Sequence, residues 1–199
     1  MNRLARIVAL GLVLVAPGLL VAQSTEDHGE VGAFADYFRF TPGSSTTNFV
    51  GVGGRLGINV HPNIALEGEM NYDFRRNFTN TFNNGFTTAF VTTSVRPLTG
   101  LFGPRIYAGA SGPVRVFVTG KVGFINFDET ATGVISGTTF TSAVNGVGGS
   151  GTHVAFYPGG GIEGFIGRVG LRLEVGDEIY LNNGTFNNLR VTFGPHIRF

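Results

Sequence analysis

Only a few residues in this chain have the types and spacing that chemistry would need. His153 could act as a general base, but no serine stands two residues from it, as expected of a lipid hydrolase of this size. The acidic pairs Asp128–Glu129 and Asp177–Glu178 could hold a divalent cation through carboxylate oxygens, although solvated charges at strand ends are the simpler interpretation. We therefore predict no catalytic residue, no cofactor site and no metal site.

The elements that would position these residues are predicted to be strands, because apolar and polar residues alternate with period two. The alternation is clearest in residues 64–74, where one face is apolar and the other acidic. Eight runs of this kind are predicted, at about residues 30–41, 50–60, 64–74, 98–109, 114–124, 153–166, 169–175 and 189–199. The inward face of the first run stays open, since Asp36 shares a face with Phe34, Phe38 and Phe40. Residues 159–164 (GGGIEG) match the dinucleotide-binding pattern G-x-G-x-x-G, but they lie within such a run and lack the βαβ unit that the motif requires.

The first 22 residues have the form of a signal peptide, with Arg3 and Arg6 before an apolar run and a small residue, Ala22, at the end. Cleavage after Ala22 would leave a periplasmic tail at residues 23–29 and one domain at residues 30–199. Fourteen basic residues nearly balance thirteen acidic ones, so no nucleic acid partner is expected. The chain has no cysteine, which excludes disulfides and thiolate metal sites.

The predicted connections alternate between short and long. Residues 61–63, 110–113 and 167–168 form short turns, whereas residues 42–47, 76–97, 128–151 and 182–187 form longer loops. Short turns on one side and longer loops on the other are typical of a bacterial outer-membrane barrel. The fold class predicted is therefore all-β: an eight-stranded antiparallel up-and-down transmembrane β-barrel. A soluble barrel with its apolar face inward is the alternative.

A membrane barrel turns its apolar face to lipid and its polar face to the lumen. An eight-stranded barrel has an interior that side chains can fill, and burying unpaired charges there would be costly. The charges of the polar face have both signs, so we expect a paired network in the lumen, made by Arg55, Glu67, Glu69, Arg105, Lys121, Glu163, Arg172, Glu174, Arg190 and Arg198. Because the chain has no Trp, the aromatic girdle is expected from Phe and Tyr, namely Tyr72, Phe74, Phe156 and Phe199.

Residues 31–199 resemble the outer-membrane barrels related to the membrane domain of OmpA. Short segments carry the resemblance: residues 53–55 with 58–59, 102–105, 159–162, Arg172 ahead of 176–177, and 193–199. The terminal segment looks like the signal that the barrel-insertion machinery reads, carried by Val191, Phe193, Ile197 and Phe199. The sequence departs from full-length OmpA in ending there, without a peptidoglycan-binding domain, so wall anchoring is not implied.

The resemblance implies a monomeric protein of the bacterial outer membrane, exported through the periplasm and in contact with membrane lipids and the insertion machinery. The function expected is non-enzymatic, in envelope structure or in surface interaction through the long outer loops. Two alternatives stay open: a narrow porin-like ion channel lined by Arg55, Glu67 and Glu69, and a lipid-modifying enzyme centred near His153.

Overall fold

The computed structural model describes residues 28–41, 46–83, 88–108, 112–132 and 150–199, so the predicted signal peptide lies outside the described residues. The described chain forms one antiparallel sheet. Its strands are β1 (Gly29–Phe40), β2 (Thr47–His61), β3 (Ile64–Asp73), β4 (Arg76–Asn83), β5 (Thr88–Ala108), β6 (Val114–Thr132), β7 (Gly151–Ile166), β8 (Val169–Asp177), β9 (Ile179–Leu181), β10 (Thr185–Phe186) and β11 (Leu189–Arg198). No helix in this part of the chain is long and apolar enough to cross a bilayer.

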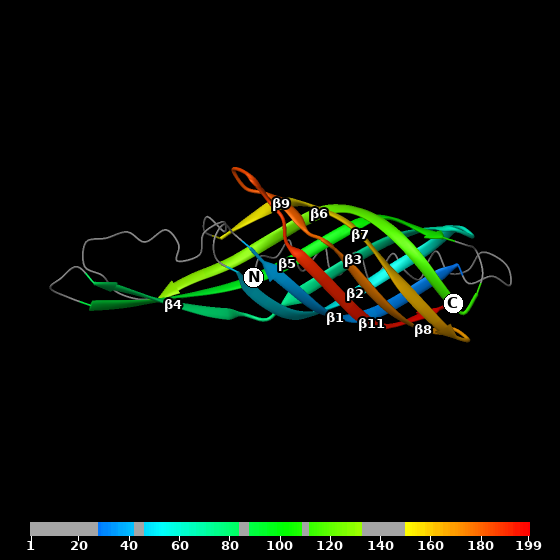
Figure 1. The fold of residues 1–199 in the computed structure, drawn as a ribbon, viewed down its shortest axis with the longest axis horizontal. Coiled ribbons are helices and arrows are strands. Elements are labelled where there is room, and N and C mark those ends of the chain that lie inside the picture. Colours follow the sequence, from blue (N-terminus) through cyan, green and yellow to red (C-terminus); the bar gives the residue numbers. More distant parts are fainter. Residues whose placement is uncertain (1–27, 42–45, 84–87, 109–111, 133–149) are drawn as a thin grey trace, which may run out of the picture.

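The sheet closes on itself, because β1 pairs with β2 on one side and with β11 on the other. Going round the ring, the order is β1, β2, β3, β5, β6, β7, β8 and β11. The remaining strands extend this ring at one end: β4 pairs with β5 above β3, and β9 pairs with β7 and β10 above β8. The predicted eight-stranded antiparallel barrel is therefore confirmed. Figure 1 shows the tilted strands and the long extension by β4 and β5.

We call the end where β1 begins and β11 finishes the turn end, and the opposite one the loop end. The turn end carries the short connections after β2 and β7, and the second of these uses Gly167 at φ 62°, a conformation that favours glycine. At the loop end the strands run on into segments predicted as loops: β4 occupies residues 76–83, the first part of β5 occupies residues 88–97, and β6 continues to Thr132. That part of the prediction was wrong. Beyond the lipid the outward face needs no apolar residues, so the alternation disappears from the sequence while the backbone pairing persists.

The outer surface of the ring is apolar. Val52, Leu56, Val118 and Leu171 are each about half exposed, and the same holds on every ring strand. Water cannot solvate such a continuous apolar band favourably, and a closed sheet leaves no unpaired edge in lipid. The soluble, inside-out alternative is therefore excluded. The predicted girdle residues Tyr72, Phe74, Phe156 and Phe199 also face outward.

The first strand, whose inward face the sequence left open, points Phe34, Asp36, Phe38 and Phe40 into the barrel. Its seam with β11 is tight: a Cβ added to Gly194 would lie 2.0 Å from the carbonyl oxygen of Ala33. Only glycine allows the two backbones to approach this closely.

Candidate functional site

The interior of the barrel is where polar side chains converge. The structure places all ten residues predicted for the lumen on inward faces, and none is more than 7% exposed: Arg55, Glu67, Glu69, Arg105, Lys121, Glu163, Arg172, Glu174, Arg190 and Arg198. Successive residues of a strand point to opposite faces, so the polar half of each alternating run lines the lumen. The structure brings these ten charges into one connected network.

Lys121, from β6, forms the centre of this network. Its Nζ lies 2.8 Å from Glu67 Oε1, 2.7 Å from Glu69 Oε2 and 2.8 Å from Glu174 Oε1. An ammonium group has three protons to donate, so one carboxylate can accept each of them. These three glutamates could by themselves hold a metal ion, and the ammonium already supplies the cation there.

Guanidinium groups connect the carboxylates nearer the turn end. Arg172 Nη2 lies 2.7 Å from Glu30 Oε1 and 3.0 Å from Glu163 Oε2. Arg105 Nη1 also bonds Glu30, at 2.7 Å, and Arg198 Nη2 bonds Glu163 at 2.6 Å. Each carboxylate is thus held by two arginines, which fixes β1, β5, β7, β8 and β11 relative to one another.

Carboxylates outnumber cations nearer the loop end. Arg190 Nε donates to Asp36 Oδ1 at 2.8 Å, and Arg190 Nη1 lies 3.5 Å from Glu178 Oε2. Neutral groups donate the hydrogen bonds that cations do not supply: Asn71 Nδ2 donates to Asp36 at 2.6 Å and Thr99 Oγ1 donates to Glu178 at 2.8 Å. This level of the lumen is therefore acidic.

Sequence reasoning missed four of the buried acids, Glu30, Asp36, Asp73 and Glu178. Asp36 lies among phenylalanines in the sequence, and Glu178 adjoins the partly exposed Asp177, which favoured a rim charge. With these four, the buried charges are eight acids (Glu30, Asp36, Glu67, Glu69, Asp73, Glu163, Glu174, Glu178) against six bases (Arg55, Arg105, Lys121, Arg172, Arg190, Arg198). Fully ionised, these buried side chains would carry two excess negative charges; half-buried Arg115, whose guanidinium lies over Tyr107 and Phe165, is a further base on the inward face.

A layer of aromatic rings lies above the charges, toward the loop end. We call it the aromatic cap; it consists of Phe38, Phe40, Phe49, Phe127, Tyr180 and Phe186. Tyr180 stacks between two rings, 6.1 Å from Phe40 and 5.0 Å from Phe186, with interplanar angles of 14° and 12°. Phe127 packs edge-on against Tyr180 at 5.3 Å. The sequence did not predict this layer, because aromatic residues on an inward face are not expected of a membrane barrel.

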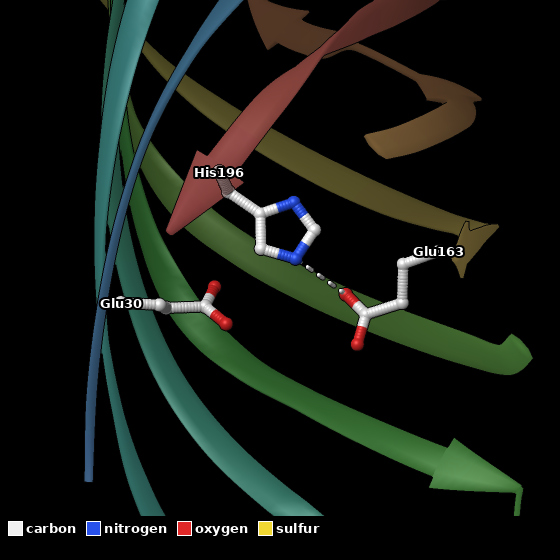
Figure 2. A group of neighbouring side chains, drawn as sticks. All are labelled: Glu30, Glu163 and His196. Carbon is white, nitrogen blue, oxygen red and sulfur yellow. Dashed lines mark ion pairs between the residues drawn. The ribbon is translucent and has the colours of Figure 1, made fainter. Parts of the chain in front are cut away.

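A second group with the composition of a metal site lies near the turn end: Glu30 from β1, Glu163 from β7 and His196 from β11. Figure 2 shows the imidazole pointing toward the two carboxylates. His196 Nε2 is 3.8 Å from Glu163 Oε2, and the ring packs edge-on against Phe165 at 4.8 Å. His196 is only 2% exposed, yet neither ring nitrogen has a hydrogen-bond partner among the described residues, and Glu30 Oε2 also lacks one there.

His153, the predicted catalytic candidate, faces the aromatic cap. Its ring lies 6.1 Å from that of Phe127 and 6.0 Å from that of Tyr180. Its Nε2 is buried and has no hydrogen-bond partner in the described part of the chain, so no serine or acid is joined to it there as a catalytic triad requires.

The other motifs do not form sites. In each acidic pair the two side chains point to different faces of the sheet, because neighbouring residues of a strand do so. Asp177 is partly exposed while Glu178 is buried, and Asp128 lies on the outer face while Glu129 points inward. Residues 159–164 lie inside β7, which rules out the strand–loop–helix geometry of a dinucleotide site. A hollow of about 460 Å³ exists between β5 and β7, but Phe102, Pro104, Phe156 and other residues of the lipid-facing wall line it.

Comparison with known proteins supports the fold. A scan of protein-family models and a search of curated proteins gave no match. Among solved structures, the chain is similar to the attachment invasion locus protein Ail of Yersinia pestis, with TM-score 0.58 and 12% identity over 88% of this chain and 100% of Ail. It is also similar to Neisserial surface protein A, NspA, with TM-score 0.53 and 8% identity over 86% of this chain and 97% of that one.

A third similar structure is the outer membrane protein OprG from Pseudomonas aeruginosa, with TM-score 0.50 and 8% identity over 88% of this chain and 98% of that one. At such identities the likeness shows the fold alone. The chain therefore has the architecture of the small outer-membrane barrels, and the resemblance to the OmpA-related family is confirmed at that level.

Proposed function

We propose that this chain is a closed-lumen barrel of the bacterial outer membrane that acts at the cell surface through the extension at its loop end. The observation that carries the proposal is the filling of the lumen by two successive layers. Ion pairs around Lys121 span the middle of the barrel, and the aromatic cap covers them toward the loop end. A path for ions would have to cross both layers, and a lumen of eight strands is only wide enough for such side chains to fill it.

The part that remains free to act is the extension itself. β4 and β5 pair from Arg76–Val95 to Asn83–Thr88, beyond the level of the girdle residues Tyr72 and Phe74. Figure 1 shows this hairpin reaching far past the ring. Residues that leave the bilayer on a rigid scaffold are well placed to contact surfaces, as loops on barrels and sandwiches often are.

The comparisons are consistent with this role. Ail was solved with the heparin analogue sucrose octasulfate, and NspA is described as a surface protein. For the present chain, exposed Arg75 and Arg76 at the base of the extension offer cationic groups to a sulfated ligand. A sulfated glycan is therefore the first class of ligand to test.

The surface role is tested by replacing residues 75–95 with a short Gly-Ser turn, which removes the extension together with Arg75 and Arg76 and leaves the ring strands. Cells displaying the full chain should bind a heparin-coated surface, or a panel of matrix proteins, more than cells displaying the shortened chain. The shortened chain must still show the heat-dependent gel mobility of a folded barrel. Equal binding by both chains would refute the role assigned to the extension.

The channel alternative is tested separately by recording conductance of the refolded chain in a planar bilayer. A folded barrel with no single-channel steps is expected. Reproducible steps would overturn the closed-lumen proposal and would make Glu67 and Glu69 the first residues to change.

The remaining contacts follow from the fold. The apolar band is proposed to contact outer-membrane lipids. The insertion machinery is proposed to recognise Val191, Phe193 and Ile197 on the outward side of β11, together with the exposed Phe199 that follows it. The ring has no free strand edge, so a monomer is expected.

A further inference from the structure

We propose that Glu30, Glu163 and His196 form a binding site for a divalent transition metal, of which Zn²⁺ is the model case, at the turn end of the lumen. This inference is independent of the surface role. It starts from buried polar atoms: both nitrogens of a histidine that is only 2% exposed, and one oxygen of Glu30, have no hydrogen-bond partner among the described residues. Buried polar atoms without a protein partner are rare in folded proteins, and where they occur a bound water or ion often satisfies them.

The geometry favours a single ion that would serve all three residues. One ligand atom from each of the three lies within 4.8 Å of the other two. Two ligands about 2.1 Å from a tetrahedral zinc are about 3.4 Å apart, and His196 Nε2 is 3.8 Å from Glu163 Oε2. A shift of a few tenths of an ångström would bring this pair to ligand spacing, and Glu30, within 4.8 Å of both, would have to approach by up to about 1.4 Å. One position would remain for water.

The surroundings hold the imidazole in place. Phe165 packs edge-on against the ring, and a Cβ at Gly170 would lie 2.6 Å from His196 Nε2, so glycine leaves the space that the ring occupies. Figure 2 shows the three side chains converging from separate strands. Such fixed orientation of a ligand by its neighbours is typical of metal sites.

The neighbouring arginines decide which metal fits. Arg105 and Arg172 bond Glu30 Oε1, and Arg198 Nε lies 4.0 Å from Glu30 Oε2. Arg198 also bonds Glu163 Oε1, and Arg172 lies 3.0 Å from Glu163 Oε2. Glu30 can thus bind an ion through Oε2 and keep both guanidiniums on Oε1, whereas an ion at Glu163 Oε2 would share that oxygen with Arg172. The positive charge of these arginines disfavours Ca²⁺ and Mg²⁺, which bind through oxygen ligands alone. Zn²⁺ and the related first-row transition metals are also bound by the imidazole nitrogen.

The position of the site also permits an ion to enter. Glu30 is the second residue of β1 and Arg198 the last of β11, which places the site about one side-chain layer inside the turn end. An ion could reach it from that opening.

The test is a Zn²⁺ titration of the refolded, tag-free chain by calorimetry, with Co²⁺ absorption as a second readout of nitrogen and oxygen ligation. One Zn²⁺ per chain is expected. The variants His196→Ala and Glu163→Gln should bind at least about tenfold more weakly. His61→Ala, which removes an exposed histidine from a turn, is the matched control and should bind as the parent does.

Heat-dependent gel mobility must first show that each variant is folded. Glu163→Gln leaves Arg172 and Arg198 short of a charged partner, so if it does not fold, Gly170→Ala, which crowds the His196 ring, takes its place. Absence of binding at about 1 mM Zn²⁺, or binding that His196→Ala leaves unchanged, would overturn the proposal; the first result would mean that water fills the gap.

Discussion

Replacing Lys121 by methionine tests whether the lumen network stabilises the barrel. The substitution keeps an unbranched side chain, one heavy atom shorter, and removes the ammonium group from between Glu67, Glu69 and Glu174. Breaking a buried ion pair by removing one partner costs about 3 to 5 kcal/mol. We expect the lower end, about 3 kcal/mol, because each carboxylate keeps another cation. Arg190, for example, stays 2.8 Å from Glu69.

The free energy of unfolding can be measured by urea titration in detergent micelles or lipid vesicles. The chain has no Trp, so far-UV circular dichroism and the fraction of folded band on a gel replace fluorescence. The matched control is Arg75→Met. It removes a partner of Asp128 at 3.5 Å, but both side chains are well exposed, 47% and 39%, so the cost should stay below about 1 kcal/mol.

A second substitution separates charge from packing. In the Lys121→Met background, Glu69→Gln removes one of the carboxylates left in excess, so the double variant should be more stable than the sum of the single changes predicts. A Lys121→Met barrel that is no less stable than Arg75→Met would refute the reasoning. Strict additivity of the two lumen changes would show that the loss came from packing.

Three further predictions use the same measurements. Gly194→Ala should lower the urea midpoint clearly, because its Cβ would lie 2.0 Å from the carbonyl oxygen of Ala33, while Gly120→Ala, with no atom within 4 Å of its Cβ, should leave it unchanged. Phe40→Ala should destabilise the barrel by about 3 to 5 kcal/mol through the cavity left in the aromatic cap, yet conductance should stay silent because the charged layer below is intact. Phe199→Ala should reduce the amount of folded protein recovered from outer membranes of cells. Refolding in detergent should proceed as before, because only the insertion machinery is proposed to recognise the Phe199 side chain.

The sequence could predict which face of most strands points inward, because the pleat turns a period-two pattern into two faces. On β3 the alternation placed Glu67 and Glu69 inside and Leu66 and Met70 outside. On β1 the same reasoning failed to decide, since Asp36 and Phe38 share a face. The reason is physical: near the loop end the lumen is itself apolar, so an aromatic residue no longer marks the lipid side.

The partners within the network could not be predicted. Lys121 meets carboxylates from β3 and β8, neither of which pairs with β6. Contacts across a lumen depend on the stagger of the strands around the ring, which the alternating pattern does not contain. For the same reason the sequence placed Glu163 on the lumen face without showing that it approaches His196.

The charged network and the aromatic cap in the lumen stabilise each other. The aromatic cap keeps water from the loop-end opening, and ion pairs strengthen as the surrounding dielectric falls, so those of Arg190 with Asp36 and Glu69 benefit from the rings beside them. The paired charges in turn tie together strands that are not neighbours in the sheet, which makes the ring stiff. A stiff ring is a poor gate but a good base for the β4–β5 extension, whose inner strand continues directly from the wall. Changes within the extension should therefore alter what the protein binds without altering its stability, whereas changes in the lumen should do the reverse.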